Sequence, residues 1–187
     1  MKPVIRCKWC GTDPLYVKYH DTEWGKPVFD DLKLFECLTL ESAQAGLSWI
    51  TILRKRENYR KAFAEFDPKK VARFSELKVK KLMLDAGIVR YELKIREAIN
   101  NAQRFLEIKK EFGSFSDYQW SFVDYKTIDH KLKPGSSPCV TIPIAESFAK
   151  DLKRRGFKFL GATTVYAHMQ ATGMVNDHVT TCLSYRN

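Results

Sequence analysis

Apolar positions along this chain recur at three- and four-residue intervals, which is the spacing of one helix face. Candidate capping residues such as Asp30, Ser48 and Asp67 indicate where helices begin. The predicted helices span residues 31–45, 48–64, 75–86, 91–110, 144–155 and 162–172, with a short helix after Asp67-Pro68. Alternation typical of strands is scarce and confined to short pieces such as residues 157–160. The pattern therefore predicts an all-α fold.

Glycine and proline mark the breaks between these helices. Residues 131–143 are rich in proline, glycine and serine, as a loop would be. Gly87 stands where a left-handed residue would end a helix, and residues 85–89 should form a tight link between two helices. A hairpin that leads into a helix N-terminus exposes backbone N–H groups for phosphate, and Arg90 and Lys94 would reinforce such binding. The simpler alternative is a solvated basic helix face.

The net charge narrows the class of partner. The chain has 187 residues and a formal net charge of +10. Such a charge favours a polyanion, with nucleic acid ahead of an acidic membrane surface. The sequence has no run of about 18 apolar residues that could span a membrane. Its first residues also lack the apolar segment of a signal peptide. We therefore expect a cytosolic protein whose positive charge either binds nucleic acid or simply solvates its surface.

Cysteine and histidine residues gather near both ends of the chain. Cys7, Cys10 and His20 lie near the start, and His178 and Cys182 lie near the end. The last two are four residues apart, so on a helix they would share one face. Two cysteines with two histidines form a closed tetrahedral zinc shell, which would be structural because it leaves no position for water. The alternative is that the cysteines are small buried hydrophobes.

Aromatic residues flank one conspicuous acid. Tyr16 and Tyr19 are three residues apart on one predicted helix face, and Trp49 opens a later helix. Glu41 lies among apolar positions of the intervening helix. Aromatic faces stack bases and attract cationic ones more strongly, while a carboxylate partly out of water prefers a positive or donor-bearing ligand. The alternatives are core packing for the rings and a solvated helix position for Glu41.

Beyond these patterns, nearly the whole chain resembles the bacterial 3-methyladenine DNA glycosylase I family. The segments that carry the resemblance are Asp13-Pro14-Leu15-Tyr16, Tyr19-His20-Asp21, Glu23-Trp24-Gly25, Gln44-Ala45-Gly46-Leu47-Ser48-Trp49, Lys55-Arg56-Glu57-Asn58-Tyr59, Asp85-Ala86-Gly87-Ile88, Arg155-Gly156-Phe157-Lys158-Phe159, Met169-Gln170-Ala171 and Val175-Asn176-Asp177-His178. The resemblance implies a helix-hairpin-helix glycosylase fold, with residues 85–90 as the hairpin. Residues 1–30 and 150–187 would form a zinc-binding lobe, and residues 31–149 would form a helical lobe carrying the hairpin.

The resemblance also implies roles for individual residues. One structural zinc ion per chain would be held by Cys7, His20, His178 and Cys182, with Cys10 as an extra cysteine. The pocket for an extruded base would be formed by Tyr16, Tyr19, Glu41 and Trp49. DNA would be contacted by Gly87, Arg90 and Lys94.

The implied reaction is removal of 3-methyladenine from double-stranded DNA by hydrolysis of its N-glycosidic bond. Methylation at N3 gives adenine a positive charge, so the base departs as a neutral molecule. Glu41, as the catalytic residue, would accept a hydrogen bond from the exocyclic amine and favour the cation over neutral adenine. The helix after Arg90 offers Glu92, Glu97 and Glu107 but no aspartate that could help water attack, so the sequence assigns no general base. We expect a monomer that needs no protein partner. The competing hypotheses are a zinc-stabilised DNA-binding module and a structural protein.

Overall fold

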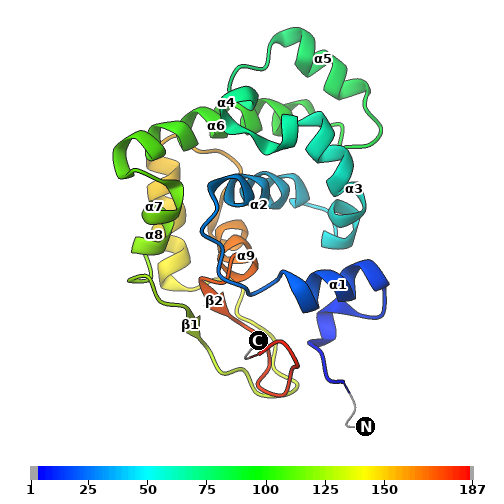
Figure 1. The fold of residues 1–187 in the computed structure, drawn as a ribbon, viewed down its shortest axis with the longest axis vertical. Helices are drawn as coiled ribbons and strands as arrows, with labels where there is room; N and C mark the ends of the chain where they lie inside the picture. The colour runs from blue at the N-terminus through cyan, green and yellow to red at the C-terminus, as the bar shows by residue number, and fades with distance from the viewer. Residues whose placement is uncertain (1–3, 186–187) are drawn as a thin grey trace.

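The computed structural model describes residues 4–185, and α-helices account for most of them (Figure 1). The α-helices are α1 (Pro14–Thr22), α2 (Asp31–Gln44), α3 (Trp49–Ala62), α4 (Pro68–Val71), α5 (Glu76–Leu84), α6 (Glu92–Phe112), α7 (Phe115–Ser121), α8 (Pro143–Arg154) and α9 (Ala162–Ala171). Two 3₁₀ turns, η1 (Lys8–Cys10) and η2 (Ala64–Phe66), and two short strands, β1 (Ile128–Asp129) and β2 (Val175–Asn176), complete the described elements. The all-α prediction is confirmed.

The helix starts follow the expected capping chemistry in two cases. Asp30 caps α2 by accepting a hydrogen bond from the backbone N–H of Lys33 at 2.9 Å. Asp67 caps α4 in the same way, and Pro68 occupies the first turn. Ser48 stands at the predicted N-cap of α3, but its hydroxyl lies against the hydroxyl of Thr51 at 2.7 Å and caps no backbone group.

Gly87 differs from the sequence prediction. Its φ is not positive, so it is not a left-handed residue, and α5 already ends at Leu84. The glycine is required by space instead, because a Cβ at this position would lie 2.9 Å from the side chain of Asn58. Its N–H donates to the Asp85 carboxylate at 2.7 Å, which folds the chain back toward α6.

Two features were not predicted from the pattern. Helix α7 is only seven residues long, capped by Ser114 and anchored by buried rings such as Phe115 and Trp120. Strand β1 pairs in parallel with β2, bringing together segments far apart in the sequence. Residues 157–160 alternate in polarity but form no strand; Phe157 and Leu160 are simply buried in the core.

Helix α2 lies at the centre of the molecule, with α6 on one side and α9 on the other (Figure 1). Its buried residues share one hydrophobic cluster with residues of α6, α8 and α9, including Phe105, Phe148 and Met169. A smaller aromatic cluster around Tyr19 and Trp24 lies outside this core. Because α8 and α9 belong to the main core, we propose that the terminal lobe begins after α9 rather than near residue 150.

The two ends of the chain meet at the same end of the molecule (Figure 1). The backbone N–H of Leu183 donates to the carbonyl of Ile5 at 2.9 Å, which joins the terminal segments directly. Within residues 4–185, none of the helices is long and apolar enough to cross a membrane.

Candidate active site and metal centre

A pocket of about 300 Å³ lies where α1, α2, α3 and α9 meet. The four residues expected to form a base pocket, Tyr16, Tyr19, Glu41 and Trp49, all line it. The rings of Tyr19 and Trp49 lie 5.5 Å apart between their centres, although they come from different helices. The structure therefore brings an acid and several aromatic faces together in one cavity the size of a small ring system.

Glu41 is the most unusual group in this pocket. Its residue is 4% exposed, which excludes the solvated helix position that was the simpler alternative. Among the described residues, no protein group donates a hydrogen bond to its carboxylate. Burial raises its pKa from the ordinary 4.5 to about 8 because water no longer solvates the charge. A buried carboxylate without a partner favours a ligand that supplies positive charge or hydrogen-bond donors.

Local contacts hold the end of α2 that carries this acid. The ammonium group of Lys94 donates hydrogen bonds to the carbonyls of Ala43 and Ala45 at 2.9 Å and 2.5 Å. These carbonyls lie at the C-terminus of α2, where helix carbonyls lack partners within the helix. Lys94 thus has an intramolecular role that the sequence did not indicate. Its contact with DNA stays a prediction.

The pocket also contains aromatic residues that were not assigned to it from the sequence. Trp9 lies 5.1 Å from Tyr16 and 4.8 Å from Trp24, measured between ring centres. Both tryptophans line the cavity, together with Gln44 and Gln170. Trp9 lies only two residues after Cys7 in the sequence. Its closeness to a candidate metal ligand was the sequence feature that could have placed Trp9 near the pocket.

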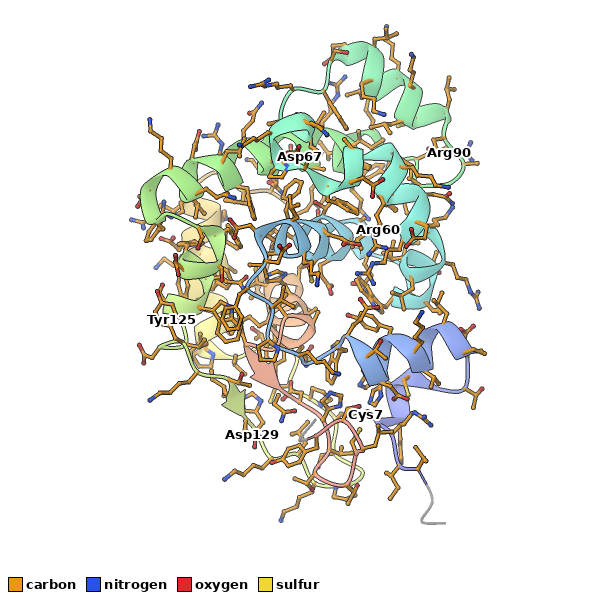
Figure 2. All side chains as sticks on the ribbon, in the orientation of Figure 1. Cys7, Arg60, Asp67, Arg90, Tyr125 and Asp129 are labelled. Carbon is orange, nitrogen blue, oxygen red and sulfur yellow. The ribbon has the colours of Figure 1, made fainter. Side chains whose placement is uncertain are left out.

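The predicted metal ligands form one buried group. The ligand atoms of Cys7, His20, His178 and Cys182 all lie within 4.8 Å of one another. The Cys7 sulfur is 3.5 Å from His178 Nδ1, and the Cys182 sulfur is 3.4 Å from His20 Nε2. Figure 2 shows Cys7 on the N-terminal segment, beside the C-terminal loop. Two sulfurs and two imidazole nitrogens at this spacing could hold a metal ion.

Neighbouring groups orient both histidines toward the sulfurs. His20 Nδ1 donates to the Asp21 carboxylate at 2.7 Å, which leaves Nε2 facing Cys182. His178 Nε2 donates to the carbonyl of Trp24 at 3.2 Å, which leaves Nδ1 facing both sulfurs. Burial lowers the pKa of His178 to about 4, so its imidazole is neutral, as metal binding requires. Such supporting hydrogen bonds are typical of histidines that bind metals.

The structure separates Cys7 from Cys10. Cys10 is buried, but its thiol lies 3.2 Å from the carbonyl of Cys7 and does not join the four-residue group. His178 and Cys182 do not lie on a helix, contrary to the sequence reasoning. A turn joins them, closed by the hydrogen bond from the Cys182 N–H to the Val179 carbonyl at 2.8 Å.

The connection between α5 and α6 satisfies most of its own backbone N–H groups. Those of Gly87 and Ile88 donate to Asp85, and that of Val89 donates to the Tyr59 hydroxyl at 3.1 Å. The N–H groups in the first turn of α6 have no side-chain cap. Arg90 is exposed at the edge of the molecule just before this turn (Figure 2). The donors open to an anion are therefore those of α6 rather than those of the hairpin itself.

The comparisons with known proteins agree on one family. A family model described as methyladenine glycosylase matches residues 9–185. This chain belongs to the methyladenine glycosylase family. The match covers the pocket, the hairpin and three of the four candidate metal ligands; Cys7 lies just before it.

Individual members of the methyladenine glycosylase family match over nearly their full length. DNA-3-methyladenine glycosylase 1 of Escherichia coli is 48% identical over 96% of each chain. DNA-3-methyladenine glycosylase of Haemophilus influenzae is 46% identical over 95% of this chain and 96% of its own. A crystal structure of a variant 3-methyladenine DNA glycosylase I in complex with 3-methyladenine is 40% identical, with a TM-score of 0.94 over 97% of this chain and 98% of that one.

An ion-pair network supports the pocket walls of this methyladenine glycosylase from behind. Arg56 on α3 pairs with Glu36 on α2 at 2.7 Å and with Glu23, the residue that ends α1, at 2.6 Å. These side chains line a second cavity of about 480 Å³, which shares Tyr19 and Trp49 with the pocket. One arginine thus connects the three helices that carry the tyrosines, Glu41 and Trp49.

Replacing Glu41 with Gln should stabilise the folded protein at alkaline pH. The folded chain keeps a proton on Glu41 up to about pH 8, whereas the unfolded chain releases it near 4.5. Wild-type stability therefore falls as the pH rises between these values, and glutamine removes that loss. At pH 9 the variant should gain on the order of a few kcal/mol in unfolding free energy, and the gain should vanish toward pH 4.

Urea unfolding at several pH values measures this difference. Glu146→Gln on the exposed surface of α8 is the matched control and should show no pH-dependent gain. If Glu41→Gln were less stable than wild type at pH 9, the carboxylate would serve the fold rather than a ligand.

Proposed function

We propose that this protein removes 3-methyladenine from alkylated double-stranded DNA by hydrolysing its N-glycosidic bond, which leaves an abasic site. The observation that carries this proposal is the unpartnered carboxylate of Glu41 buried in an aromatic pocket. The curated relatives have this activity in their names, and a related glycosylase was crystallised with the free base. The family relationship and the pocket chemistry therefore support the same substrate.

The charge of the lesion explains why an acid belongs in this pocket. Adenine methylated at N3 is a cation in DNA, and aromatic faces attract cations through their negative π surfaces. Without a ligand, the raised pKa keeps Glu41 protonated at neutral pH. A cationic base favours loss of that proton, and the resulting carboxylate gives the base a counter-charge away from water, where electrostatic attraction is strongest. A neutral adenine supplies no positive charge that would favour this ionisation. The pocket therefore favours the lesion over the normal base once either is extruded from the duplex.

The bond-breaking step requires little chemistry from the protein. As the bond between C1′ and N9 breaks, its electron pair moves to N9 and the base leaves as neutral 3-methyladenine. Water adds to C1′ and loses a proton to solvent. Glu41 is the one carboxylate among the described residues that line the pocket. We assign it to holding and orienting the cation, and we assign no residue as a general base.

Replacing Glu41 with Gln should slow excision of 3-methyladenine about ten- to a hundredfold, because a hydrogen bond to a charged group contributes about 1.5–3 kcal/mol. Affinity for undamaged DNA should hardly change, since phosphate contacts dominate it. Single-turnover release of the free base from methylated DNA, followed by chromatography, measures the rate. Glu146→Gln again serves as the surface control. An unchanged rate in folded Glu41→Gln would contradict the assignment.

We also propose that Cys7, His20, His178 and Cys182 hold one structural zinc ion. Two thiolates and two neutral imidazoles are a common tetrahedral zinc shell, and four protein ligands leave no position for a reacting water. When bound, the ion would neutralise the buried thiolates and join the two ends of the chain. The burial of all four residues and the hydrogen bonds that orient both histidines support this assignment.

Elemental analysis of the purified protein should find one zinc per chain. Cys182→Ala should lose the metal and melt at a lower temperature, because it removes one ligand from a site that joins both termini. Cys10→Ala is the sharper control, since Cys10 is equally buried but lies outside the ligand group. Cys37→Ala, on α2, should also retain the metal. A stable, metal-free wild type, or loss of zinc in Cys10→Ala, would overturn the ligand assignment.

For the duplex, we propose that the hairpin and the start of α6 contact the phosphate backbone through Gly87 and Arg90. The net charge of +10, the exposure of Arg90 and the uncapped N–H groups of α6 support this contact. One chain supplies the pocket, the metal ligands and this surface. We therefore propose that the protein acts as a monomer. We also propose that it acts in the cytoplasm.

Arg90→Ala should weaken binding to duplexes of any sequence about equally. It should also reduce the slope of log affinity against log salt concentration by about one, because one phosphate contact is lost. Lys94→Ala should change the slope less, since that ammonium already bonds to Ala43 and Ala45. Fluorescence anisotropy with a labelled duplex at several salt concentrations measures both effects. Lys126→Ala, exposed beside β1, is the control, and equal slopes for Arg90→Ala and Lys126→Ala would exclude the hairpin as the docking surface.

A further inference from the structure

Gln170 lines the same pocket as Glu41, near the end of α9. Its backbone is held in place, because its carbonyl accepts a hydrogen bond from the N–H of Gly25 at 3.1 Å. The side chain is half-buried, so its amide has only a few possible partners. Which of its two ends faces the cavity decides what it could recognise.

Asp177 determines how the amide is oriented. The Gln170 Nε2 donates to Asp177 Oδ2 at 2.6 Å, and the carboxylate of Asp177 is 1% exposed. The same carboxylate accepts hydrogen bonds from the Tyr166 hydroxyl at 2.5 Å and from His130 Nδ1 at 2.7 Å. A carboxylate can only accept, so the amide of Gln170 must present its NH₂ group to Asp177. The hydrogen-bond network therefore decides which end of the amide is oxygen and which is nitrogen.

The opposite end of the amide, Oε1, is then left for the pocket. Among residues 4–185, no protein donor lies within hydrogen-bond distance of this oxygen. Gln170 lines the cavity and Asp177 does not, and Oε1 is the end of the amide that is turned from Asp177. This oxygen keeps its acceptor character at any pH, because an amide does not titrate.

The lesion offers two hydrogens to acceptors of this kind. In DNA, adenine methylated at N3 has only two N–H bonds, and both belong to its exocyclic amine at C6. We propose that Glu41 accepts one of these hydrogens and Gln170 Oε1 accepts the other, so that Gln170 selects alkylated purines with an amine at C6. This inference rests on the proposed function and adds a specificity residue to it. Asp177 is the positioning residue that keeps the acceptor turned inward.

The same arrangement disfavours alkylated guanine. Guanine has a carbonyl oxygen at C6, so a guanine placed in the same way would set that oxygen against Oε1, acceptor against acceptor. A site built to bond an N–H group discriminates strongly against an analogue that lacks it, because the buried polar group then stays unpaired. Discrimination between 3-methyladenine and 3-methylguanine should therefore depend on Gln170.

Gln170→Met tests the proposal, because methionine has a similar length and no hydrogen-bonding oxygen. Excision of 3-methyladenine and 3-methylguanine is measured in single turnover on methylated DNA. We expect the excision rate of 3-methyladenine to fall roughly tenfold, because the variant loses one hydrogen bond to a cationic donor. The rate for 3-methylguanine should stay the same or rise, so the ratio of the two rates narrows. Gln103→Met, exposed on α6, is the matched control and should leave both rates unchanged.

A second measurement separates recognition from folding and from DNA binding. Free 3-methyladenine and free 3-methylguanine are titrated against each variant, and quenching of the pocket tryptophans Trp9, Trp24 and Trp49 reports binding. If Gln170→Met does not fold, Gln170→Asn is used instead. Its side chain is one carbon shorter, so the amide oxygen lies farther from the base, and the ratio of the 3-methyladenine rate to the 3-methylguanine rate should again narrow. A wild-type ratio in a folded variant would overturn the role of Gln170. A wild type that releases no 3-methyladenine would instead overturn the proposed function.

Discussion

The burial of a single carboxylate is the constraint on which the rest of this structure depends. Removing Glu41 from water opposes its ionisation, and no protein donor compensates for the loss among the described residues. The fold must therefore keep water away from this part of α2 and prevent the helix from moving so that Glu41 becomes exposed. It does so through the central position of α2 in the core, through Lys94 at the end of the helix and through Arg56 behind it. At neutral pH the acid responds to burial by keeping its proton, and a ligand that carries positive charge favours its ionisation.

Much of the architecture could be predicted from the sequence because it depends on local rules. Helices with a long apolar face and a capping aspartate, such as α2, appeared where the pattern placed them. Glu41 stood out as an acid at an apolar position, and the cysteines and histidines near both ends stood out as candidate metal ligands, with Cys7 and Cys10 as alternatives. The family resemblance then indicated which of these residues belong together. These parts were predictable because each depends on residue identity at a fixed spacing.

The parts that could not be predicted depend on contacts between distant segments. Helix α7 is too short to show a period, and the β1–β2 pair involves two residues on each strand. Gly87 was correctly marked as special but for the wrong reason, since the side chain of Asn58 and not a positive φ requires it. Lys94 bonds to carbonyls that lie 51 and 49 residues away in the sequence. The amide of Gln170 is oriented by Asp177, seven residues away. No periodicity in the sequence records such pairings.

The separation of the four ligands along the chain has a consequence for the order in which the molecule is made. Cys7 and His20 leave the ribosome long before His178 and Cys182, because synthesis runs from the N-terminus. The group of candidate ligands therefore cannot close until His178 and Cys182 have emerged. The rings of Trp9 and Trp24 pack against His20 and also line the pocket. One wall of the pocket therefore lies against a group whose two halves are synthesised at widely separated times.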